Sequence, residues 1–322
     1  MAYISFQPND YFNTKIYTGT GSSNALTGVG FQPDWTWIKR RNATASHAIQ
    51  DAVRGNDKSL RSNTTGAEYT NTFFSSFDTD GFTVTSSESD VNASAETYAS
   101  WNWKANGSGS SNTDGTTSST VSVNTTAGFS IVKWTGSGSA TTIGHGIGVT
   151  PKIIMLKNTS EVYGWQVYHA SLGNTKYLAL DSTDAEATSS ESWNNTSPTS
   201  TVFSVGASDS NNKSGNTIIA YCFAEKKGFS KFGSYVGNGS TWGTFVNCGF
   251  KPAWIMLKDT NSGSAGWMMF DNKRLGYNVD NNALYPNATA AEGTGDDVDL
   301  LSNGFKARST DAGINTSGNS YI

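Results

Sequence analysis

The chain has 322 residues, enough for two or three domains, and its 22 basic and 26 acidic residues give a formal net charge of −4. No tract of clustered Lys and Arg supplies the electrostatic footprint of a nucleic-acid-binding protein, so we expect no nucleic-acid partner. No apolar run is long enough to span a bilayer and the first residues lack the features of a signal peptide, so we expect neither membrane insertion nor ordinary export.

The chain begins with a predicted docking arm, residues 1–11, ahead of the first strand. It carries three aromatic side chains, Tyr3, Phe6 and Tyr11. Terminal segments are ordered when they contact the rest of a protein, and transfer of aromatic rings out of water lowers the free energy. We therefore expect the arm to dock on a neighbouring surface.

A ten-residue segment occurs three times, at 30–39, 148–157 and 249–258. Each copy carries a proline and follows a strand-like run that ends in an aromatic residue and a Gly-x-Gly turn. The prolines are 118 residues apart (151 − 33) and then 101 apart (252 − 151), which indicates three copies of a module of about a hundred residues. The residues that define the repeat are Pro33, Trp35, Pro151, Pro252 and Trp254.

The repeated segment is predicted to form a buried strand. Proline cannot donate a ladder hydrogen bond, so it belongs at the first residue of a strand or on an edge. Alternate residues from Trp254 to Leu257 would point to opposite sides, and both sides are apolar, as in a central strand covered on both faces. We expect the lysine that closes each copy, such as Lys258, to keep its ammonium group in solvent.

The predicted modules cover residues 12–104, 121–228 and 229–322. Residues 105–120 are polar and rich in Gly, Ser and Thr, and are expected to form a flexible linker. The second and third modules follow each other without a linker. We therefore expect these two modules to be held rigidly together and the first to move more freely.

The third module stops early by the logic of the repeat. Residues 318–322 align with residues 215–219, after which the last strand of the second module continues to Phe223. We expect either that the chain continues beyond Ile322 or that a neighbouring subunit supplies the missing strand, and we favour the first.

Turn signals predict an all-β fold. Asp80-Gly81 and Asn303-Gly304 precede strand-like runs and are typical of two-residue hairpin turns, whose central positions need positive φ. We predict about seven or eight short strands in each module and no long helix. The expected architecture is three tandem antiparallel β-sandwiches of the jelly-roll or concanavalin-like kind.

Two modules place an aspartate three residues before an arginine at the same repeat position. The pairs are Asp51 with Arg54 and Asp271 with Arg274, whereas the second module has His169 and Leu172 there. Such a pair could bind a polar ligand or form the charged half of a glycosidase site. The alternative is an ion pair that braces a turn, since perturbed ion pairs are often structural.

Metal and catalytic signals are weak. The segment 78–81 is half of an EF-hand pattern but ends in a hairpin dipeptide. The acidic loop with Asp296, Asp297 and Asp299 could supply oxygen ligands to a metal ion, and the alternative is that it is only a solvated loop. The three histidines share no metal-ligand spacing, and no nucleophile motif is present. We expect no metal, cofactor or catalytic residue, although a carboxylate pair for glycoside hydrolysis has no fixed spacing in sequence.

The opening residues 1–15 and the repeated Gly-Phe-x-Pro-x-Trp motif resemble virion-associated proteins of marine tailed phages, including those of cyanobacteria. The segments 101–107 and 270–274 fit the same pattern, and the resemblance covers essentially the whole chain. It implies a lectin-like β-sandwich protein in a phage particle, as part of an appendage, with no assigned catalytic residues to transfer.

We therefore expect a non-enzymatic structural protein of the virion, assembled in the host cytoplasm. Its expected role is that of a tail-fibre or similar appendage that contacts host-surface polysaccharide. Other virion proteins and further copies of the chain, with a trimer as one option, are the expected partners. The alternatives are a capsid decoration or tail scaffold without ligand, and a glycan-degrading depolymerase. We expect the ligand-binding tip to contain Asp271, Arg274, Asp296, Asp297 and Asp299.

Overall fold

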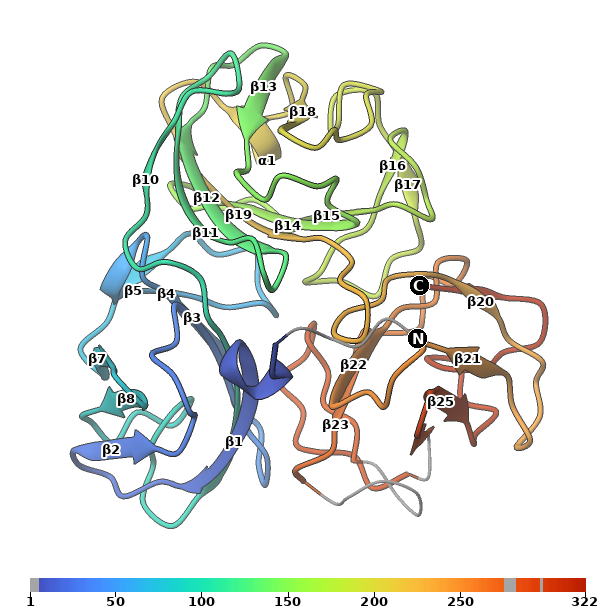
Figure 1. Cartoon of the computed structure of the whole chain (residues 1–322). Helices are drawn as coiled ribbons and strands as arrows, with labels where there is room; N and C mark the ends of the chain where they lie inside the picture. The colour runs from blue at the N-terminus through green and yellow to red at the C-terminus, as the bar shows by residue number, and fades with distance from the viewer. Residues whose placement is uncertain (1–5, 275–281, 296–297) are drawn as a thin grey trace.

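A computed structural model describes residues 6–274, 282–295 and 298–322. It confirms the all-β prediction, because the described helices are only η1 (Pro8–Asp10) and α1 (Asp209–Asn212), and every pair of named strands runs antiparallel. Neither of these short helices could cross a membrane. Figure 1 shows three lobes, with the first module in blue, the second in green and yellow, and the third in orange and red.

The strands are short in all three modules. The first module contains β1 (Phe12–Thr18), β2 (Asn24–Thr27), β3 (Trp35–Arg40), β4 (His47–Asp51), β5 (Gly55–Leu60), β6 (Tyr69–Thr70), β7 (Phe74–Asp78), β8 (Gly81–Val84) and β9 (Thr97–Trp103). The second contains β10 (Ser110–Asn112), β11 (Ser119–Asn124), β12 (Phe129–Thr135), β13 (Thr141–Gly144), β14 (Ile153–Asn158), β15 (Gln166–His169), β16 (Lys176–Tyr177), β17 (Ala187–Thr188), β18 (Val202–Val205) and β19 (Thr217–Phe223). The described part of the third contains β20 (Tyr235–Val236), β21 (Phe245–Asn247), β22 (Trp254–Leu257), β23 (Met268–Asp271), β24 (Val298–Leu301), β25 (Gly304–Ala307) and β26 (Ser320–Tyr321).

The repeated segment forms β3, β14 and β22, and β3 and β14 lie inside six-stranded sheets. In both of these sheets the last strand of the module, β9 or β19, pairs with the repeated strand. A smaller sheet of each module, such as β2-β8-β7 in the first, packs over one face. This arrangement gives each module an outer core of its own, between the larger and the smaller sheet.

The other face of each larger sheet meets the other modules in a central core. Alternation along the strand separates the two environments: Ile38 lies in the outer core of the first module, whereas its neighbour Trp37 lies in the central core. The central core joins residues from all three modules, and the rings of Trp35 and Tyr221 stack across it with centroids 4.4 Å apart. Its largest members are Trp35, Trp37, Trp101, Trp103, Phe129, Trp165, Tyr221 and Trp267.

The lysine that ends each repeated segment is fully buried, so the expectation of a solvated ammonium group was wrong. Each Nζ donates to backbone carbonyl oxygens, at least one of which belongs to a neighbouring module. The strand end lies against that neighbour, so the lysine stem leads into the interface instead of into solvent. The acceptors across the interface are Thr289 for Lys39, Thr65 for Lys157 and Thr183 for Lys258, at 3.3, 3.1 and 3.0 Å.

A second set of contacts joins the modules in the same order. It uses the first residue of β4 and the residue just before β15 and β23, and each ring nitrogen meets a carbonyl oxygen of the neighbour. The pairs are His47 with Tyr285, Trp165 with Arg61 and Trp267 with Ala179, at 2.9, 2.9 and 2.8 Å. The first module thus contacts the third, the third contacts the second, and the second contacts the first, which closes a ring.

Residues 105–120 are not the flexible linker that their composition predicted. Strand β10 lies within this segment and extends the larger sheet of the second module. The amides of Ala105 and Gly107 donate to the carboxylate of Asp34, at 2.6 and 3.0 Å. Together with the central core, these bonds remove the greater freedom that we expected for the first module.

Candidate functional site

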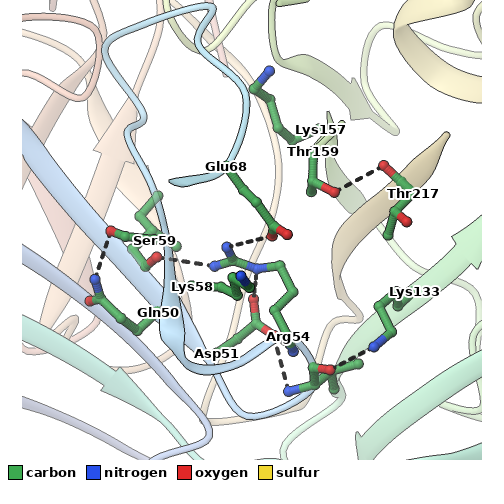
Figure 2. A network of polar contacts seen from close by, with 12 residues as sticks. Gln50, Asp51, Arg54, Lys58, Ser59, Glu68, Lys133, Lys157, Thr159 and Thr217 are labelled. Carbon is green, nitrogen blue, oxygen red and sulfur yellow. Dashed lines mark hydrogen bonds and ion pairs between the residues drawn. The ribbon is translucent and has the colours of Figure 1, made fainter. Parts of the chain in front are cut away.

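The Asp51–Arg54 pair of the first module lies in a buried network that Figure 2 shows from close by. Asp51 ends β4, and Nε of Arg54 is 2.5 Å from its Oδ2, with both side chains almost completely buried. The hydroxyl of Tyr221, from β19 of the second module, donates to the same oxygen at 2.7 Å. Burial opposes the charge on Arg54, but the nearby carboxylate of Asp51 raises the pKa of its guanidinium above the usual value. The pair therefore joins two modules.

The Asp271–Arg274 pair repeats this geometry in the third module. Nε of Arg274 is 2.8 Å from Oδ2 of Asp271, and Nε1 of Trp101, from β9 of the first module, donates to that oxygen at 3.0 Å. Glu292 accepts from Arg274 at 3.0 Å and from Arg41 of the first module at 2.8 Å. Each aspartate thus accepts a hydrogen bond from an aromatic side chain in the last strand of a neighbouring module.

This placement contradicts the expected ligand-binding role of Asp271 and Arg274. Both side chains are at most 1% exposed and bond to protein groups, so a ligand at the surface does not reach them. The alternative that we weighed, an ion pair bracing a turn, describes them better, because the Lys273 amide also donates to Asp271 at 2.9 Å. Asp296 and Asp297 lie outside the described residues. Asp299 lies on β24 and forms an ion pair with Arg308.

The acidic turn at Asp78–Gly81 is explained by hydrogen bonds within the protein. The Asp80 carboxylate accepts from the amides of Gly28 and Gly30 at 2.9 and 2.6 Å, and these bonds lower its pKa. Asp78 accepts from the hydroxyls of Ser76 and Thr83. Within residues 6–274, 282–295 and 298–322, no group of three or more acidic, His or Cys side chains is arranged to hold a metal ion.

An exposed aromatic surface on the third module was not anticipated from the sequence. Trp242 is 70% exposed, and Val236 and Phe245, which lie within six residues of it in the chain, are 56% and 43% exposed. Nζ of Lys306, on β25, lies 3.9 Å from the centroid of the Trp242 ring, and Cζ of Arg308 lies 5.2 Å from it. We call the residues Trp242, Phe245, Lys306 and Arg308 the Trp242 surface.

The loop that carries Trp242 is held in place by a buried asparagine. Nδ2 of Asn315 donates to Oδ1 of Asn238 and to the carbonyl oxygen of Ser240, at 3.0 and 2.7 Å. Gly237 begins this loop, and a Cβ there would lie 2.2 Å from the carbonyl oxygen of Thr316, so the loop requires glycine. The ring of Trp242 is therefore presented on a fixed backbone.

The same asparagine recurs in each module and could have been found in the sequence. Asn92, Asn212 and Asn315 each stand five residues before the last strand of their module, at 97, 217 and 320. All three are fully buried and bond to the Gly-x-Gly loop. A buried side chain therefore fixes each of these loops as a turn.

The fold and the candidate site together define an all-β protein of antiparallel sandwiches around a shared aromatic core, with an exposed aromatic and basic surface on the third module. Comparison with known proteins found that the family model described as a domain of unknown function, DUF7483, matches residues 7–322. The chain belongs to this family. No curated protein and no solved structure matches the chain.

Proposed function

We propose that the protein is a structural component of a phage virion and that its Trp242 surface binds acidic polysaccharide on the host cell. The resemblance of the opening residues and of the repeated motif to virion-associated proteins supports the first part. The Trp242 surface supports the second, and it replaces the tip that we expected around Asp271 and Arg274.

The single observation that carries the binding role is an indole ring 70% exposed beside two cations. Leaving an aromatic ring of this size in water is costly unless a partner covers it, and rigid Trp side chains with Arg are typical of binding surfaces. A sugar ring can stack on the indole, while Lys306 attracts its carboxylate or sulfate groups. Arg308 lies on the other side and also pairs with Asp299. The fixed loop keeps the entropic cost of binding low.

The test measures binding of purified protein to immobilised acidic polysaccharide and to intact host cells, with and without removal of surface polysaccharide. We expect saturable binding that weakens with salt, because both cations are partly exposed and salt screens them. Trp242→Ala should weaken it about tenfold, since a contact of this kind contributes about 1.4 kcal/mol. Folding should be unaffected, because Trp242 is exposed.

A matched control exists on the second module, where Nζ of Lys213 lies 5.6 Å from the ring of Tyr163 and pairs with Glu161. Tyr163→Ala/Lys213→Ala should bind as the wild type does. Equal binding by wild type and Trp242→Ala would remove the ligand role from this surface. Absence of any binding by folded protein would favour the scaffold alternative, and release of sugar fragments would favour the depolymerase.

A further inference from the structure

The side chain of Lys306 stands on the outward face of the three-stranded sheet β21-β25-β24, of which β25 is the middle strand. Its neighbours in the chain, Phe305 and Ala307, point the other way, into the outer core of the third module. Across the sheet Lys306 faces Phe245 on one side and Asp299 on the other. Lys306 therefore lies between an exposed aromatic side chain and a carboxylate.

The ammonium group of Lys306 lies over an aromatic ring instead of pairing with that carboxylate. Nζ is 3.9 Å from the centroid of the Trp242 ring, a distance typical of a cation–π contact. The carboxylate of Asp299 pairs with Arg308 at 2.9 Å. Within the part of the chain that the structure describes, Lys306 forms no ion pair, so its charge is available to a ligand.

The two cations beside Trp242 differ in how firmly they are held. Arg308 lies on the other side of the ring, with Cζ 5.2 Å from the centroid, and Asp299 fixes its guanidinium group. The ammonium group of Lys306 is held by the ring contact, and a cation–π contact between exposed groups is weak. Lys306 can therefore leave its face of the indole more easily than Arg308 can leave the other.

A cation over the ring affects neutral and acidic sugars differently. A sugar stacks by laying its apolar C–H face on the π face of the indole, and in the free protein the ammonium group of Lys306 lies over that face. A neutral sugar displaces the cation and offers it no new partner. An acidic sugar offers a carboxylate or sulfate group, and an ion pair with Lys306 then replaces the cation–π contact. The surface should therefore favour sugars that carry a negative charge.

We propose that Lys306 determines the specificity of the Trp242 surface, because its ammonium group covers the indole until an acidic group of the ligand draws it away. This inference rests on the polysaccharide role proposed above and narrows the ligand class. The carboxylate or sulfate group belongs to the sugar that stacks on Trp242 or to the next sugar, because the ammonium group reaches it while the backbone of Lys306 stays in β25. Uronates and sulfated sugars fit this requirement, and neutral glycans do not.

The test compares polymers that share a backbone and differ in charge, namely polygalacturonate with its methyl ester and dextran sulfate with dextran. The complete 322-residue protein should bind the acidic polymer of at least one pair more tightly than the neutral one. In Lys306→Ala, affinity for that acidic polymer should fall about fivefold, because the ion pair is lost. Affinity for the neutral polymer should rise about threefold, because no cation covers the ring. The ratio of the two affinities should therefore fall about fifteenfold.

A matched control exists at Lys213, which also lies over an aromatic ring, that of Tyr163, but pairs with Glu161 on the second module. Lys213→Ala should leave both affinities unchanged. Lys306→Arg keeps the positive charge and should retain the selectivity. NMR measures the displacement itself, because the ring current of the indole shifts the ε-methylene protons of Lys306 upfield in the free protein. That shift should disappear when the acidic polymer binds.

The outcomes separate this inference from the function on which it rests. Binding that depends on Trp242 but shows the same ratio of affinities in Lys306→Ala would overturn the role of Lys306 and leave the polysaccharide role intact. An upfield shift that persists in the saturated complex would overturn the displacement of the ammonium group. Binding that Trp242→Ala does not weaken, or no binding of either acidic polymer, would contradict the polysaccharide role and this inference with it.

Discussion

At the scale of single residues, buried polar side chains fix how the modules meet. Burial lowers the pKa of Lys39, Lys157 and Lys258 to about 8 in each case, yet each Nζ retains carbonyl acceptors. The sequence predicted the burial of the strand that precedes each lysine. It could not predict the burial of the ammonium group, because the carbonyl acceptors across the interface come from loops that are distant in the chain.

Two buried histidines should make the protein sensitive to mild acid. Burial, together with the charge of Lys39 in the first case, lowers the pKa of His47 to about 3, and burial lowers that of His169 to about 4. As the pH falls below about 6.5, these two histidines therefore bind protons in the unfolded state but not in the folded state, so the free energy of unfolding falls with the pH. We expect each histidine to remove about 2 kcal/mol of unfolding free energy between pH 7 and pH 5.

Denaturant titrations at both pH values measure this loss. His47→Gln is a matched variant, since an amide can accept from Nε1 of Trp37 and donate to Tyr285 as the imidazole does. Its unfolding free energy should change less between pH 7 and pH 5 than that of the wild type. An unchanged pH dependence would show that His47 does not stay neutral in the folded state.

At the scale of elements, the repeated strand and its proline were predicted well because local periodicity determines them. β3, β14 and β22 begin within two residues of Pro33, Pro151 and Pro252, and each is apolar on both faces. The error at 105–120 has the opposite cause. A Gly- and Ser-rich composition predicts flexibility, but the Asp34 carboxylate and the edge of β11 order this segment through bonds to its backbone.

The buried ion pair at the end of β4 provides a stability prediction. Arg54→Met leaves the Asp51 carboxylate buried without its cation, and we expect it to lower the unfolding free energy by about 3–5 kcal/mol. Arg40→Met removes the partly exposed pair with Glu96 and should cost about 1 kcal/mol or less. Chemical denaturation of both variants checks this, and equal losses would mean that the Asp51 network does not stabilise the module interface.

At the scale of the whole molecule, the three modules should unfold as one unit. The central core takes side chains from all of them, so no module keeps both faces of its larger sheet covered without the others. We expect a single calorimetric transition whose measured and van't Hoff enthalpies agree. Trp35→Ala should lower the unfolding free energy by about 3–5 kcal/mol and shift that whole transition. Separate transitions would show that the modules are independent.

The position of the candidate site could not be predicted at this scale. The sequence favoured Asp271 and Arg274 because charged residues in an unusual loop suggested a ligand, but the ring of modules covers them. Trp242 was not singled out from the sequence. Its exposure follows from a loop geometry that depends on Asn315, a residue 73 positions away (315 − 242).

The one-way order of contacts between the modules is the arrangement that three identical subunits would adopt around a threefold axis. When the copies are joined in one polypeptide, a change in one copy no longer appears in all three. His47 stands where the other modules have Trp165 and Trp267, and His169 stands where they have Asp51 and Asp271. Because the modules are linked in one chain, the third module can carry an exposed aromatic surface that the other two lack. All three modules still contribute side chains to the shared core.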